Sequence, residues 1–314
     1  MKKESQQRAS TLELRGSFVA LVTPFRNGAV DFSKLRDLVE FHLKNGTKGI
    51  VPCGTTGEGS TLKFEEKVEI FEIVAKTVKD RIPVIAGVGS NDTASAIQLA
   101  RAAKQAGVHG LLSVAPYYNR PSQRGLLAHF SKLAESVDLP IVLYNIPSRT
   151  GVNIDPETLL QLREFKNIVG VKESVMDLDQ VSKVVWMCGK DFTVFSGEDA
   201  LTLPMMALGA KGVISSSANV IPQDMASLCE ACEQGEWGRA RELHYRLWPL
   251  IKSLFMETNP VPVKTAMALM GMIEEEVRLP LVPMEGENVE KIKKALQAYG
   301  LLSASPKQKG SNRS

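Results

Sequence analysis

The feature that most constrains the fold is a regular alternation of short β-branched runs with longer stretches of helical periodicity. Stretches such as 32–44 and 93–105 are long enough for a helix that crosses over to a parallel neighbouring strand. Eight such runs with helices between them predict an α/β fold, a (β/α)8 TIM barrel, rather than an open doubly wound sheet. The predicted strands are Phe18–Thr23, Gly49–Cys53, Val84–Val88, Gly110–Ala115, Ile141–Asn145, Ile168–Lys172, Thr193–Ser196 and Gly212–Ser215.

The pattern changes after the last predicted strand. Segments 224–256 and 262–269 have helical periodicity, and no further strand is predicted beyond them. We therefore expect a barrel over residues 15–221 and a C-terminal helical extension over residues 222–302 that packs on it. The polar ends, 1–14 and 303–314, are predicted to be disordered.

Composition favours a small-molecule partner. The 314 residues include 38 basic and 35 acidic side chains mixed along the chain, with a formal net charge of +3. This balance provides no concentrated field for nucleic acid or an anionic membrane, so neither partner is expected. No apolar run approaches the roughly 20 residues that span a bilayer. The polar start of the chain also lacks the apolar region of a signal peptide, and we expect a cytoplasmic protein.

The cysteines and histidines do not form a metal or disulfide pattern. The four cysteines are too scattered for a disulfide framework, although Cys229 and Cys232 have a C-x-x-C spacing. A zinc site would need a second ligand pair, yet the four histidines lie far apart in the sequence. Because the C-x-x-C pair lies inside the helical run 224–233, we expect neither a metal nor a redox role for it.

The reactive groups of such a barrel belong at the C-terminal ends of its strands, and Lys172 lies at such an end. The preceding residues 168–171 are typical of a buried strand, where a charged ammonium is costly to desolvate. One explanation is structural, with Glu173 or Glu198 as an ion-pair partner. The other is catalytic, because burial favours the neutral amine that attacks a ketone. The strand pattern alone leaves both open.

Polar groups at other strand ends favour the catalytic explanation. Tyr144 lies one strand from Lys172, where a phenol can move protons during carbinolamine formation and dehydration, although an interface tyrosine is the alternative. Thr55 and Thr56 follow another strand, and their hydroxyl and backbone N–H groups can bind a carboxylate or simply cap a glycine-rich turn. The serine run 215–217 has no nucleophile-elbow pattern and is interpreted as a polar strand end.

Four ordered motifs resemble those of the dihydrodipicolinate synthase and N-acetylneuraminate lyase family. They are Gly-Thr-Thr-Gly-Glu at 54–58, Pro-Tyr-Tyr-Asn-Arg-Pro at 116–121, Tyr-Asn-Ile-Pro-Ser-Arg-Thr-Gly at 144–151 and Gly-Val-Lys-Glu at 170–173. The resemblance runs from about residue 16 to residue 302, and motifs in this order and spacing are not expected by chance. It implies a pyruvate-dependent class I aldolase, a lyase, built on a (β/α)8 barrel.

The resemblance also implies a role for each site residue. Lys172 would form the Schiff base with pyruvate, while Tyr144, Thr55 and Tyr118 would form a proton relay. Tyr118 would reach into the active site of a neighbouring subunit, because the usual assembly of the family is a homotetramer made of two tight dimers. Thr56 would bind the carboxylate of pyruvate. The positions that would line the pocket through backbone carbonyls are Gly197 and Ile214.

The choice of second substrate depends on Arg149. A guanidinium at this position can bind a carboxylate in a bidentate way, which suits L-aspartate-4-semialdehyde better than a polyhydroxylated sugar acid. The implied reaction is aldol addition of pyruvate to the semialdehyde and cyclisation to 4-hydroxy-tetrahydrodipicolinate, which opens the lysine and diaminopimelate branch. No metal or organic cofactor is implied, because the imine is the electron sink. The alternatives are an aldolase of N-acetylneuraminate or a 2-keto-3-deoxy sugar acid, and a barrel that binds without catalysis.

Inhibition by lysine is expected to be weak or absent. Lysine-inhibited members of the family bind the inhibitor with histidine and glutamate side chains, and the matching positions here carry Phe64, Lys67 and Ser95. Asn91 and Tyr117 match the family. The loss of an acidic partner and the gain of a positive charge both weaken the binding of an ammonium group.

Overall fold

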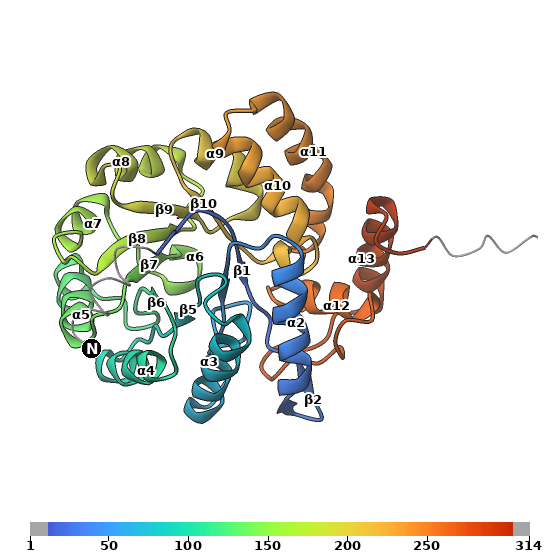
Figure 1. Cartoon of the computed structure of the whole chain (residues 1–314), viewed down its shortest axis with the longest axis horizontal. Coiled ribbons are helices and arrows are strands. Elements are labelled where there is room, and N and C mark those ends of the chain that lie inside the picture. The colour runs from blue at the N-terminus through green and yellow to red at the C-terminus, as the bar shows by residue number, and fades with distance from the viewer. Residues whose placement is uncertain (1–11, 304–314) are drawn as a thin grey trace, which may run out of the picture.

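The computed structural model describes residues 12–303, in which eight parallel strands form one sheet in the order β4-β1-β10-β9-β8-β7-β6-β5. A bridge between Ile50 and Val84 joins the two end strands, and Gly87 N donates to Pro52 O at 3.0 Å. The sheet is therefore closed, and the predicted (β/α)8 barrel is confirmed (Figure 1). The strands are β1 (Gly16–Ala20), β4 (Gly49–Val51), β5 (Ile85–Gly87), β6 (Gly110–Val114), β7 (Ile141–Asn145), β8 (Ile168–Glu173), β9 (Thr193–Ser196) and β10 (Gly212–Ser215).

The first strand differs from its predicted range of 18–23. It begins at Gly16, whose N–H donates to Lys211 O at 2.8 Å. It ends at Ala20 because Val22 N donates to the side chain of Asn219 at 3.1 Å instead of to a neighbouring strand. A short hairpin of β2 (Phe25–Arg26) and β3 (Ala29–Val30) follows and was not predicted, although its Asn-Gly turn is a common hairpin signal.

Helices surround the strands in the ring expected of eight β–α units (Figure 1). The N-terminus of α4 (Thr93–Gln105) shows why the sequence folds this way locally, since Asp92 accepts from the N–H groups of Ala94 and Ser95. The helices between β1 and β10 are α2 (Phe32–Lys44), α3 (Phe64–Val78), α4 (Thr93–Gln105), α5 (Gln123–Ser136), α6 (Pro147–Thr150), α7 (Pro156–Leu162), α8 (Leu178–Cys188) and α9 (Thr202–Ala207), and the 3-10 turns are η1 (Asp199–Leu201) and η2 (Ser217–Asn219).

Four further helices follow the last strand, as the predicted C-terminal extension requires, and lie on one side of the barrel (Figure 1). They are α10 (Pro222–Glu233), α11 (Trp237–Ser253), α12 (Val261–Leu269) and α13 (Gly286–Tyr299). Cys229 and Cys232 lie inside α10, where both thiols are buried. Among residues 12–303, no helix combines the length and apolarity needed to cross a bilayer.

Two apolar clusters build the core. One fills the barrel interior with side chains such as Phe18, Val142 and Phe195, and the larger one lies between strands and helices. This division follows from the alternation of side chains along each strand. Leu12 and Leu14, which the prediction placed in the disordered start, pack against the interior cluster. The rest of the predicted disorder, apart from residues 13 and 303, lies outside the described residues.

Candidate active site

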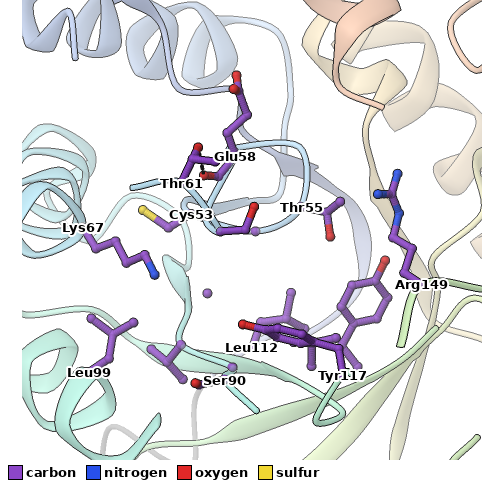
Figure 2. A pocket seen from close by; sticks show the side chains of 18 of the residues that line it. Cys53, Thr55, Glu58, Thr61, Lys67, Ser90, Leu99, Leu112, Tyr117 and Arg149 are labelled. Atoms are coloured by element: carbon purple, nitrogen blue, oxygen red, sulfur yellow. Dashed lines mark hydrogen bonds between the residues drawn. The ribbon is translucent and has the colours of Figure 1, made fainter. Parts of the chain in front are cut away.

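A cavity of about 640 Å³ opens at the carboxyl ends of the strands. Its walls come from the loops after β4, β5, β6 and β7 and from the segment that precedes α12. Figure 2 shows Lys67 and Arg149 at opposite sides of this cavity, with Thr55 on the same side as Arg149. Cavities of this size at this end of a barrel are typical of sites for small molecules.

Lys172 lies beneath this cavity in the barrel interior. It is the Cα partner of Tyr144 in the parallel pair of β7 and β8, so both side chains lie on the same face of the sheet. Lys172 Nζ is 4.3 Å from the centroid of the Tyr144 ring, and Lys172 is only 5% exposed. Tyr144 lines the cavity. The structure thus brings the predicted amine and the predicted phenol together.

The structural explanation of Lys172 required an ion pair with Glu173 or Glu198. Glu173 points to the other face of β8, where its carboxylate accepts from Asn145 Nδ2 at 3.0 and 3.1 Å and from Gln180 Nε2 at 3.3 Å. Within the described residues, neither glutamate forms an ion pair with Lys172, whereas the other deeply buried lysine, Lys264, forms one. The buried amine of Lys172 is therefore not neutralised by a carboxylate in contact.

Burial acts strongly on Glu173, which is 0% exposed. Desolvation raises its pKa to about 7, against the opposing effect of the hydrogen bonds from Asn145 and Gln180. Burial also raises the pKa of Glu198, and the nearby charges of Lys172 and Arg149 partly offset this effect. Both carboxyl groups therefore hold protons more readily than exposed glutamates do.

Gly197 leaves room for the side chain of Lys172. A Cβ atom at position 197 would lie 3.0 Å from Lys172 Cε and 1.9 Å from Ser174 Oγ, so any larger residue must displace one of these groups. Ile214, the other predicted backbone contributor, is a buried residue of β10 in the barrel interior. Both residues lie close to the strand ends, but neither of them lines the cavity.

The two threonines follow β4 in a tight turn. The turn depends on Gly59, where a Cβ atom would lie 2.2 Å from Cys53 O. Thr55 lines the cavity, whereas Thr56 is buried and its hydroxyl contacts Ser216 and Asn259. Within residues 12–303 the backbone N–H groups of both threonines have no acceptor. The turn therefore offers two N–H donors, as expected of a carboxylate site.

Arg149 and Tyr118 differ in their relation to the cavity. Arg149, on the short helix α6, lines it and donates from Nη2 to Asn259 O at 3.3 Å. Tyr118 does not line it, and its side chain is 90% exposed. The backbone of Tyr118 has a positive φ of 74°, a conformation that is uncommon for a non-glycine residue. Tyr117, one of the positions matched to lysine binding, lines the cavity instead.

Sequence reasoning missed a buried ion pair under the cavity. Lys264 Nζ contacts Glu58 Oε1 at 2.6 Å, and both side chains are almost fully buried. Arg278 N also donates to Glu58, at 2.9 Å. The contacts fasten the turn after β4 to the C-terminal extension. The single charged residue in the helix 261–269, Lys264, was the available signal.

The contact partners of Thr56 were missed as well. The sequence marks Ser216 only as part of a polar strand end and does not mark Asn259 at all. Each lies far from Thr56 in the chain, by 160 and 203 residues respectively. No local pattern reports such a distant contact.

Comparison with known proteins gives a consistent result. The model of the dihydrodipicolinate synthetase family matches residues 13–299. The 4-hydroxy-tetrahydrodipicolinate synthase of Syntrophus aciditrophicus is 54% identical over 288 residues, which cover 92% of this chain and 99% of that protein. Among solved structures, dihydrodipicolinate synthase from Aquifex aeolicus is 51% identical with a TM-score of 0.91, over 92% of this chain and 99% of that one.

A third relative was solved with a small molecule. The chloride-inhibited dihydrodipicolinate synthase from Acinetobacter baumannii, complexed with pyruvate, is 40% identical with a TM-score of 0.91. The match covers 92% of this chain and 100% of that one. Since the family model spans nearly all the described residues and these relatives align over almost their whole length, this chain belongs to the dihydrodipicolinate synthetase family.

Proposed function

We propose that this chain condenses pyruvate with L-aspartate-4-semialdehyde to give 4-hydroxy-tetrahydrodipicolinate, through a Schiff base on Lys172. The observation that carries the proposal is a buried amine at the carboxyl end of β8, beside the Tyr144 ring and free of any carboxylate contact within residues 12–303. Family membership supports the reaction, and the relative from A. baumannii binds pyruvate.

The chemistry begins with attack of the Lys172 amine on C2 of pyruvate. Loss of water from the carbinolamine gives an imine, which draws electrons from C3 so that a proton leaves and an enamine forms. The enamine attacks the aldehyde carbon of the semialdehyde. The amino group of that product then attacks the imine carbon, which closes the ring and releases Lys172. One molecule of each substrate gives one product and one water, and the scheme requires no metal or organic cofactor.

These proton transfers need a relay, which we assign to Tyr144, Thr55 and Tyr118. Tyr144 contacts Lys172 and lines the cavity together with Thr55. Tyr118 lies on the surface, so the relay is complete when a second chain places its own Tyr118 in the cavity. Tyr118→Phe should slow turnover without changing the unfolding transition, and an unchanged rate would remove Tyr118 from the relay.

The expected assembly is a homotetramer of two tight dimers. Tyr118 supports one contact surface, and the exposed Trp186 on α8, 81% exposed, supports another on a different element. Large exposed aromatic side chains are typical of surfaces that another chain covers. Sedimentation of the wild-type protein and of Trp186→Ala tests this assignment, because loss of the second surface should leave dimers. The expectation of a cytoplasmic location stays a prediction.

Binding of the two substrates is assigned to different walls of the site. Thr56 and its turn bind the carboxylate of pyruvate, and the backbone carbonyls of Gly197 and Ile214, which do not line the cavity itself, are assigned to the barrel interior beside Lys172. Arg149, at the side of the cavity, binds the carboxylate of the semialdehyde. Arg149→Ala should therefore raise the KM for the semialdehyde or lower kcat, while imine formation with pyruvate continues.

The decisive experiment is borohydride reduction in the presence of pyruvate, followed by intact mass and peptide mapping. A reduced adduct on Lys172 is expected. Lys172→Ala should abolish trapping, whereas Lys183→Ala, a change in an exposed surface ion pair, should preserve it. Trapping that survives in Lys172→Ala would move the nucleophile elsewhere, and no trapping in the wild type would end the proposal. Turnover with N-acetylmannosamine in place of the semialdehyde would redirect it to a sugar-acid aldolase.

A further inference from the structure

The hydroxyl of Ser216 contacts a threonine that is distant in the sequence, Thr56, because β1 alone separates β4 from β10 in the sheet. Ser216 directly follows β10, and Thr56 lies in the turn after β4. Their Oγ atoms are 2.7 Å apart, and both side chains are buried. A polar residue at the end of the eighth strand thus has a specific partner in the turn that offers N–H donors to the cavity.

Asn259 completes this contact from a third segment, just before α12. Its Nδ2 donates to Thr56 Oγ1 at 3.0 Å and to Ser216 Oγ at 3.3 Å. Within residues 12–303 the two hydroxyl oxygens have no other hydrogen-bond partner. The Asn259 backbone is itself held, because its carbonyl oxygen accepts from Arg149.

The cluster of Thr56, Ser216 and Asn259 contains a hydroxyl proton without an acceptor. The Asn259 Nδ2 group only donates, and both hydroxyl oxygens lie on the same side of it, so it takes no proton from either of them. One of the two hydroxyls then donates to the other across the 2.7 Å contact. The remaining hydroxyl proton has no acceptor among the described residues, and a buried donor without an acceptor is costly. A ligand oxygen would remove that cost.

We infer that Ser216 is a positioning residue for the keto acid: its bond with Thr56 directs the remaining hydroxyl proton of the pair to the substrate carboxylate. The inference rests on the proposed function, in which the turn at Thr56 binds pyruvate. Ser216 acts through Thr56 and is not assigned to the proton relay. A carboxylate is the group that accepts such a proton most strongly, because hydrogen bonds to charged groups exceed neutral ones in strength.

Ser216→Ala removes one bond from the cluster and leaves the Thr56 hydroxyl free to rotate. The KM for pyruvate should rise about fivefold, the factor that corresponds to one hydrogen bond of ordinary strength. The kcat and the KM for the semialdehyde should change little, because the lost interaction holds pyruvate equally before and during the reaction. Steady-state kinetics with each substrate varied in turn measures this separation.

Ser217→Ala is the matched control. Ser217 is the next residue, is also buried, and its hydroxyl makes no hydrogen bond to Thr56 or Asn259. Ser217→Ala therefore removes the same atom without disturbing Thr56, and the KM of this variant for pyruvate should stay at the wild-type value. Ser216→Thr restores a hydroxyl at the site and should recover most of the affinity for pyruvate.

Three outcomes would overturn the inference. The first is an unchanged KM for pyruvate in Ser216→Ala, and the second is an equal change in Ser217→Ala. The third is a full effect of Ser216→Ala in a Thr56→Val background, since Ser216 would then act without Thr56. Should Ser216→Ala fail to fold, Ser216→Cys preserves the shape with a weaker donor and takes its place. Borohydride trapping on Lys172 in these variants separates failure of this inference from failure of the proposed function.

Discussion

Replacement of Glu173 by glutamine should remove a dependence of stability on pH. Glu173 is fully buried beside Lys172 in the chain, and its carboxylate contacts Asn145, Gln180 and the N–H of Val175. No ion pair compensates its charge within the described residues. Desolvation raises its pKa from 4.5 to about 7, so the folded state favours the protonated form.

The sign and the size of the effect follow from this rise. Because the pKa in the folded state is above that in the unfolded state, the stability that Glu173 contributes is fully present below about pH 4.5. It is lost as the pH rises toward 7, where the folded protein must bury a charge. A pKa difference of one unit between the folded and unfolded states corresponds to about 1.4 kcal/mol. The free energy of unfolding should therefore fall by about 3 kcal/mol over this range.

Urea unfolding at a series of pH values, at fixed protein concentration, measures the difference between wild type and Glu173→Gln. The amide resembles the protonated acid, so the variant should gain stability relative to wild type between pH 4.5 and 7 and keep that gain above pH 7. Glu157→Gln is the control, because contact with Lys183 lowers the pKa of the exposed Glu157 and reverses the sign. A constant difference between wild type and Glu173→Gln across pH would refute the reasoning.

Three more perturbations test other parts of the structure. Gly197→Ala should slow imine trapping by pyruvate about tenfold to a hundredfold, because the new Cβ lies 3.0 Å from Lys172 Cε and must displace the amine. Lys264→Met should lower the free energy of unfolding by about 3–5 kcal/mol, because Glu58 is then left buried without its partner. Millimolar lysine should leave the steady-state rate nearly unchanged, because the ammonium of Lys67 repels that of lysine.

Each of these three predictions has its own control. Gly238→Ala adds a Cβ where no atom lies within 4 Å, so its trapping rate should equal that of wild type. The double variant Glu58→Gln with Lys264→Met should recover most of the stability lost by Lys264→Met, and no recovery would mean that packing rather than charge is responsible. Strong inhibition by lysine would show that Lys67 does not prevent ammonium binding.

The alternation of strands and helices, and the position of Lys172 one strand from Tyr144, could be predicted from the amino-acid sequence alone. Both follow from periodicity: side chains alternate along a strand, and parallel neighbours in register present the same face, so the amine and the phenol meet in the barrel interior. Lys172 could be singled out as the proposed nucleophile because a charged group at the end of an apolar run conflicts with its surroundings.

Only the tertiary structure decided which distant groups meet at the site. Glu58 and Lys264 are 206 residues apart, and Thr56 is 160 residues from Ser216, yet each pair is in hydrogen-bond contact. Such contacts depend on how loops leave the closed barrel and on where the C-terminal helices pack, and no local pattern encodes either. The burial of Lys172 had two local explanations, and the fold removes an ion pair with Glu173 because it turns that carboxylate toward Asn145 and Gln180.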